Sequence, residues 1–73
     1  MLFMSERSEE IMQRKLRGIM AERQVTLTDL HERTGIAVST LSDIRRGKQS
    51  PTVKTLEKIA EGLGVSVKDF FVE

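Results

Sequence analysis

Apolar side chains recur three and four residues apart along most of the chain, which is the spacing of one face of an α-helix. The first such stretch contains four of them, Met12, Leu16, Ile19 and Met20. Ser8 precedes this stretch and is followed by two acidic residues, which is typical of a helix N-terminus. The pattern predicts a first helix from Ser8 to about Arg23, after a flexible segment at residues 1–7.

Two short helices are predicted around a tight turn in the middle of the chain. Thr26 and Asp29 have the spacing of a capping box, which marks the start of the second helix. Gly35 ends that helix, because glycine tolerates the left-handed conformation at a helix C-terminus. The third helix runs from Val38 to Arg46. Two short helices joined so tightly cannot lie antiparallel, so we expect them to cross at a steep angle.

The remainder of the chain predicts a fourth helix and a short fifth one. Thr52 caps the fourth helix, and Gly64 ends it. Its apolar stripe consists of Leu56, Ile59, Ala60 and Leu63. Ser66 and Asp69 again have capping-box spacing, and they begin a last turn or two that ends at Phe71.

Length and composition favour one all-α domain over residues 1–73. A chain of 73 residues forms a single domain. Three Phe, no Tyr, no Trp and no sustained alternation of apolar and polar residues make strands a poor interpretation. A core of this size is marginal and the chain has no cysteine for a disulfide, so we expect tight helix packing and oligomerisation to stabilise it.

Composition also excludes several kinds of site. A chain with no cysteine and with one histidine, His31, has no cluster of metal ligands, so we expect no metal and no cofactor. We expect no enzyme and no small-molecule ligand, since paired carboxylates, nucleophile–histidine pairs and a phosphate-binding glycine loop are not recognisable. The apolar start at residues 1–4 is too short for a signal or membrane segment, so we expect a cytoplasmic protein.

Charge is distributed unevenly although the net charge is only +1. Arg45, Arg46 and Lys48 surround Gly47 with no acidic residue among them. For a phosphate backbone, a local basic patch matters more than the total charge.

From Thr26 to Phe71 the chain resembles the lambda-repressor-like family of helix-turn-helix domains, also called the Xre family. The resemblance rests on several coinciding features: Gly35 followed by Ile36, the inward Leu41 and Ile44, the Arg46-Gly47-Lys48 run before Pro51, and the tail TLEKIAEGLGVSVKDFF. It implies a compact five-helix DNA-binding domain. Helices two and three form the helix-turn-helix, and the third helix lies in the major groove, which accepts one helix.

Base contacts are expected from the third-helix residues that do not face the core, Val38, Ser39, Ser42 and Asp43. By resemblance, Val38, Ser39 and Asp43 match the main base-reading positions of the family. Val38 can pack on a thymine methyl group, Ser39 can bond to several bases, and Asp43 can accept from a cytosine amino group. The alternative is that Val38 and Asp43 are merely exposed and that specificity comes from elsewhere.

Phosphate contacts are expected from the end of the third helix and the loop after it. The candidates are Thr40, Arg45, Arg46, Gly47, Lys48 and Ser50. The glycine lets backbone amides approach the duplex closely. The alternative is a solvated helix C-terminus, where the helix dipole favours cations without any ligand.

Three features depart from the family pattern. Leu27 replaces a glutamine that touches phosphate in many relatives. Met20 and Arg45 stand where relatives tend to pair a buried arginine with a glutamate. Because both partners change, no lone buried charge is implied. We expect Met20 to fill the gap and Arg45 to turn toward DNA. His31 replaces a small alanine, and we expect a partly buried ring.

A single domain reads only a few base pairs, so the sequence favours a homodimer on a palindromic operator. Family members also self-associate around their last helices. The expected dimer surface is Val67, Phe71 and Val72, while Phe70 closes the core of the monomer. The alternative is that all of these residues close the monomer core.

The expected function is sequence-specific binding of double-stranded DNA as a dimeric transcriptional repressor or autoregulator. A protein-interaction module of the same fold, antitoxin-like or a regulatory partner with weak or no base reading, stays open as the alternative. Leu27, Val38 and Asp43 are the residues that keep it open, because none of them is a usual DNA-contacting type.

Overall fold

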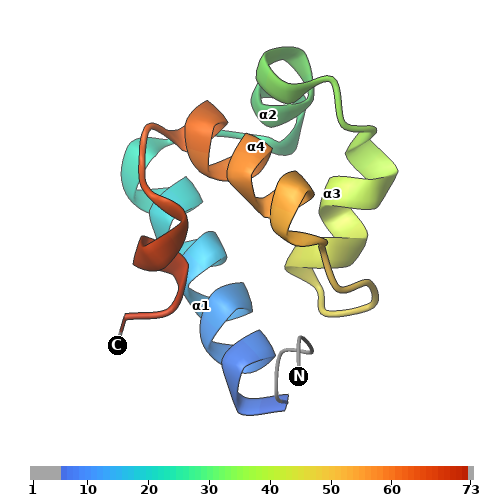
Figure 1. Cartoon of the computed structure of the whole chain (residues 1–73). Coiled ribbons are helices and arrows are strands. Elements are labelled where there is room, and N and C mark those ends of the chain that lie inside the picture. The colour runs from blue at the N-terminus through green and yellow to red at the C-terminus, as the bar shows by residue number, and fades with distance from the viewer. Residues whose placement is uncertain (1–5, 73) are drawn as a thin grey trace.

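The computed structural model describes residues 6–72 and contains only helices and connecting turns within that range. The elements are α1 (Glu6–Arg23), α2 (Leu27–Thr34), α3 (Val38–Arg45), α4 (Val53–Leu63) and the 3-10 helix η1 (Val67–Phe70) (Figure 1). The expected all-α class is confirmed for these residues. The expected crossing of the two short helices is visible in Figure 1, where α2 is seen nearly end-on and α3 along its length.

The prediction of five α-helices is wrong at the C-terminus. Residues Val67–Phe70 form a single 3-10 turn, with backbone hydrogen bonds from Asp69 N–H to Ser66 O and from Phe71 N–H to Lys68 O. The spacing of Ser66 and Asp69 did mark the start correctly, since the Ser66 N–H donates to the Asp69 carboxylate at 2.9 Å. A four-residue segment can form backbone hydrogen bonds between residues three apart. It is too short for a series of the α-helical bonds between residues four apart.

The start of α1 also differs from the expectation. Helix α1 already includes Glu6 and Arg7, so Ser8 lies inside the helix and is not its N-cap. Of the segment predicted to be flexible, residues 1–7, the structure therefore describes only the last two residues, and both are helical. Its first five residues lie outside the described part of the chain.

The boundaries of α2 follow the predicted capping chemistry. The Thr26 hydroxyl accepts from the Asp29 N–H at 3.0 Å, and the Thr26 N–H donates to the Asp29 carboxylate at 2.9 Å. This backbone N–H is the main reason why the pKa of Asp29 is lowered. The capping box therefore stabilises α2 fully at pH values above the ordinary pKa of an aspartate. This stabilisation is lost as the pH falls through the lowered pKa of Asp29 in the folded protein. Gly35 ends the helix at a φ of 77°, as expected.

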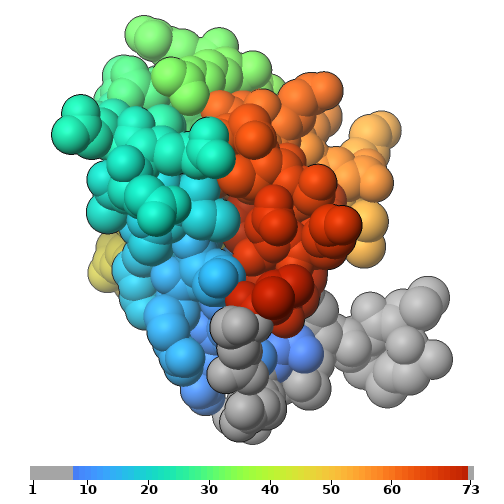
Figure 2. Space-filling model, turned by 90° about the vertical axis from the view of Figure 1, so that its left-hand side faces the viewer, coloured from blue at the N-terminus to red at the C-terminus, as the bar shows by residue number. Residues whose placement is uncertain are grey.

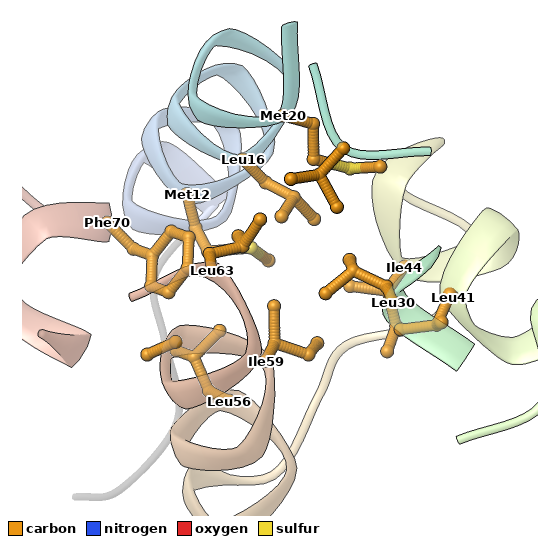
Figure 3. Packing of buried hydrophobic residues seen from close by; sticks show 12 residues of the cluster. Met12, Leu16, Met20, Leu30, Leu41, Ile44, Leu56, Ile59, Leu63 and Phe70 are labelled. Carbon is orange, nitrogen blue, oxygen red and sulfur yellow. The ribbon is translucent and has the colours of Figure 1, made fainter. Parts of the chain in front are cut away.

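Twelve apolar side chains form one core, eleven from the five elements and one, Val25, from the connection between α1 and α2. They are Met12, Leu16, Met20, Val25, Leu30, Leu41, Ile44, Leu56, Ile59, Ala60, Leu63 and Phe70. Figure 3 shows the α1 and α4 side chains facing each other, with Phe70 closing one end and the α2 and α3 side chains the other. The inward positions predicted for α3 and α4 are confirmed.

The C-terminal segment and α3 lie on different sides of this core. η1 packs against α1 and α4, whereas α3 packs against α1 and α2. Figure 1 shows α1 and α4 between them, and Figure 2 shows the C-terminal segment lying along α1 on the face away from α3. A surface at the C-terminus therefore leaves α3 accessible.

Two helix-interior glycines give a matched pair of predictions. Gly18→Ala is expected to raise the free energy of unfolding by about 0.5–1 kcal/mol, because alanine orders more cheaply in a helix and a Cβ at Gly18 meets nothing within 4 Å. Gly62→Ala should instead destabilise the domain, since its Cβ would lie 2.9 Å from Thr34 Cγ2 and 3.2 Å from Leu30 Cδ2.

The Thr34 side chain cannot easily give way to that Cβ. Its hydroxyl donates to Leu30 O at 2.7 Å and accepts from the Ile36 N–H at 3.1 Å. We expect a net loss of about 1–2 kcal/mol for Gly62→Ala, typical of overpacking. Urea unfolding of both variants measures the pair, and equal shifts in the same direction would contradict the close packing of α2 on α4.

Candidate nucleic-acid interface

The turn between α2 and α3 is held by side chains as well as by Gly35. The Thr34 hydroxyl bridges Leu30 O and the Ile36 N–H, as described above. His31 Nδ1 lies 2.8 Å from Ile36 O and must donate the hydrogen bond, because a carbonyl oxygen only accepts. The His31 ring is exposed, so the expectation of a partly buried ring is wrong. The histidine is solvent-exposed, and its hydrogen bond stabilises the turn that orients α3.

The inner side of α3 is fixed by two buried residues, Leu41 at 1% exposure and Ile44 at 0%. Their burial sets the outward face of the helix. Val38 is 39% exposed and Ser39 is exposed. The remaining predicted contact residues on α3 are half-buried, namely Thr40, Ser42, Asp43 and Arg45. The described chain therefore leaves the beginning of α3 open to solvent.

The loop after α3 presents the basic residues beside this open surface. Arg46, Gly47, Lys48 and Ser50 are all exposed. The loop is ordered by Asp43, whose carbonyl oxygen accepts from the Lys48 N–H at 2.8 Å and from the Gln49 N–H at 3.3 Å.

Glycine is favoured at position 47 by its backbone conformation. Its φ is +82°, a conformation that costs a residue with a side chain about 1–2 kcal/mol. A Cβ there would also lie 2.8 Å from the end of the Gln13 side chain on α1. The α3–α4 loop therefore passes close to α1 at this point.

An open groove of about 920 Å³ lies between α1, the start of α2 and α3. Its lining residues are Arg17, Met20, Ala21, Gln24, Val25, Thr26, Leu27, Thr28, Val38, Arg45 and Arg46. The expectation that Met20 turns inward is confirmed by its 4% exposure. Arg45 lines the groove and is half-buried.

Sequence reasoning missed Arg17 as part of this surface. Arg17 is exposed on α1, outside the helix-turn-helix, and no motif or spacing in the sequence connects it with α3. The sequence offered one weak signal. Arg17 lies one helical turn before Met20, the residue that departs from the family pattern, so the two side chains share a face of the helix.

At the C-terminus the predicted dimer residues differ in exposure. Phe70 is fully buried, as expected. Val67 and Phe71 are half-buried against the core, and Val72 is 56% exposed. The part of the chain that is described holds no group of three or more side chains able to bind a metal ion. Within the same part, every helix is too short or too polar to cross a membrane.

The comparisons with known proteins agree with this geometry. Residues 15–72 match the family described as the Cro/C1-type helix-turn-helix DNA-binding domain. The chain is 34% identical over 61 residues to an uncharacterized HTH-type transcriptional regulator of Methanocaldococcus jannaschii, covering 84% of this chain and 92% of that protein. It is 36% identical over 53 residues to the immunity repressor protein of Bacillus phage phi105, covering 73% of this chain and 37% of the repressor.

A further relative is the HTH-type transcriptional regulator DdrOP3 of Deinococcus deserti, 36% identical over 55 residues. That alignment covers 75% of this chain but 43% of the relative, so the chain spans less than half the length of this protein and of the phage repressor. The matched family consists of DNA-binding domains of transcriptional regulators and is not a class of enzyme. With residues 15–72 matched, the chain belongs to the Cro/C1-type helix-turn-helix family of DNA-binding domains.

Proposed function

We propose that this chain binds a specific double-stranded DNA sequence as a homodimer and represses or autoregulates transcription in the cytoplasm. The observation that carries the proposal is the exposed beginning of α3 next to the exposed Arg46-Gly47-Lys48 loop. A helix inserted in the major groove needs an uncovered outer side, and it needs cations beside it for the two phosphate strands.

Base reading is assigned to the four predicted residues of α3 according to their exposure. Val38 and Ser39 are the most accessible, so they supply the thymine-methyl contact and the hydroxyl hydrogen bond. Ser42 and Asp43 are half-buried and contact bases at the edge of the site. A carboxylate near phosphates is repelled, so Asp43 acts mainly by accepting from a cytosine amino group.

Phosphate binding is assigned to the loop and its flanks. The guanidinium of Arg46 and the ammonium of Lys48 neutralise phosphates, and the strand can approach the Gly47 backbone closely because no side chain intervenes. Thr40 and Ser50 add neutral hydroxyl donors, and Arg45 adds a cation from the groove side of α3.

Dimerisation is assigned to the C-terminal residues Val67, Phe71 and Val72. Their position on the face away from α3 supports the assignment, because pairing there leaves both recognition helices free. The principal extents of the molecule are 32 × 21 × 18 Å. On a palindromic operator, the two recognition helices of the dimer must lie one DNA turn, about 34 Å, apart.

Selection of bound duplexes from a random pool, followed by salt-titrated binding, tests the proposal. A palindromic winner is expected, and its affinity should fall steeply as salt rises. The interaction-module alternative instead predicts no enriched sequence and little salt dependence. Failure to enrich any duplex, with a flat salt response, would reject DNA reading by this chain.

Arg46→Ala is expected to reduce the slope of log affinity against log salt by about 0.9 for each bound protomer, because one phosphate contact is lost. Lys58→Ala is the matched control, since Lys58 is an exposed cation on α4 outside the site. Fluorescence anisotropy on the selected duplex measures both slopes. Equal slopes for the two variants would exclude Arg46 from the interface.

A further inference from the structure

The α1–α3 groove is lined by three arginines and by no acidic residue. Arg17 comes from α1, and Arg45 and Arg46 come from the end of α3 and its cap. Among residues 8–72, no side chain or backbone group forms a hydrogen bond or ion pair with these three guanidinium groups. Three cations that share one concave surface without counter-charges favour an anionic occupant.

The floor of the same groove is apolar. Met20 and Val25 are buried beneath it, Leu27 is half-buried, and Val38 borders it at the start of α3. Figure 3 shows Met20 at the end of the core nearest to the turn that leads into α2. An anion that fits this groove therefore carries an apolar face next to its charge, as a deoxyribose ring does next to its phosphate.

The groove also reaches both ends of the recognition helix. Its lining includes Val38 at the first position of α3 and Arg46 just after the last. A DNA strand that borders a helix in the major groove follows that helix on its flank. The strand on the α1 side of α3 therefore passes this groove.

We propose that the groove seats a sugar–phosphate unit of the DNA strand on the α1 side of α3, and that Arg17 binds its phosphate together with Arg45. This inference rests on the proposed DNA-binding function and extends the interface to α1, outside the helix-turn-helix. Leu27 then contributes apolar contact to the sugar, at the position where many relatives bind phosphate through a glutamine.

The first experiment measures the salt dependence of binding to the selected duplex for Arg17→Ala. The matched control is Arg14→Ala, which removes the same charge from an exposed position one turn earlier on α1 that does not line the groove. Arg17→Ala should lower the affinity about tenfold per bound protomer, the effect of one charge-assisted hydrogen bond. It should also reduce the salt slope by about 0.9 per protomer. Arg14→Ala should leave the slope unchanged.

The second experiment locates the phosphate. Duplexes that carry one neutral methylphosphonate at successive backbone positions should reveal a position where the natural chain loses clearly more affinity than Arg17→Ala does, since Arg45 alone then binds that phosphate in the variant. Arg46→Ala should still lose affinity at that position, because its own phosphate is a different one. Thermal melting of each variant checks that the fold is unchanged, as expected for exposed arginines.

The outcomes separate this inference from the proposed function. If Arg46→Ala reduces the slope but Arg17→Ala behaves like Arg14→Ala, the α1 contact is wrong while DNA binding by α3 stands. If Arg17→Ala loses as much affinity as the natural chain at every methylphosphonate position, the groove seats no phosphate through that residue. If the natural chain itself shows no salt-dependent binding, the proposed function fails and this inference fails with it.

Discussion

Phe70→Ala is expected to lower the free energy of unfolding by about 3–5 kcal/mol, the range for a phenylalanine truncated in a packed core. Phe70 is 0% exposed and reaches the core from η1, where that 3-10 turn packs against α1 and α4. Figure 3 shows its ring at one end of the core, near Met12 and Leu63.

This loss is large relative to the stability of so small a domain. At about 0.05–0.15 kcal/mol per residue, a chain of this length has an unfolding free energy of about 4–11 kcal/mol. Urea denaturation followed by far-ultraviolet circular dichroism measures the change. Val53→Ala is the control, because this side chain is 71% exposed and lies outside the proposed dimer surface, so it should lose clearly less. Equal losses for the two variants would contradict the assignment of Phe70 to the core.

Much of this fold could be predicted from the sequence because its helix ends are encoded locally. Thr26 with Asp29, and Thr52 before α4, are side chains whose capping bonds depend only on residues within one turn. Gly35 and Gly64 end helices through their own conformational freedom, with φ values of 77° and 74°. These local signals do not depend on tertiary packing, so α2 and α4 begin and end where the sequence pattern indicates.

The errors fall where tertiary packing decides. The last segment reads as an α-helix, but its length and the need to bring Phe70 into the core leave a 3-10 turn. The His31 ring reads as partly buried beside Leu30, yet it stays exposed because Ile36 O offers its Nδ1 a partner across the turn. Both outcomes depend on groups that lie outside the local pattern.

The candidate site shows the same division. The outward residues of α3 followed from the inward spacing of Leu41 and Ile44, which is a local property of the helix. The groove did not follow, because it needs α1 and α3 to be placed side by side in space. Only that placement brings Arg17 to the same surface as Arg45.

Phe71→Asp is the second variant with a large expected effect, and it should act on assembly and leave folding intact. Phe71 is half-buried at the end of η1, beside the exposed Val72, so a carboxylate there keeps contact with water in the monomer. In a dimer formed through Val67, Phe71 and Val72, two such carboxylates would be buried near each other, which is strongly unfavourable. We expect a folded monomer, seen as half the mass in sedimentation equilibrium.

Loss of the dimer should weaken binding to the palindromic duplex by about 10²–10⁴-fold, because the second half-site then no longer binds at a high effective concentration. Binding to an isolated half-site should be unchanged, since α3 lies on another side of the core. Val53→Asp, which changes an apolar side chain of 71% exposure at the start of α4, is the control for oligomeric state and should stay dimeric. A Phe71→Asp protein that remains a dimer would place the interface elsewhere, whereas a monomer that still binds the palindrome at full strength would show that each domain reads DNA alone.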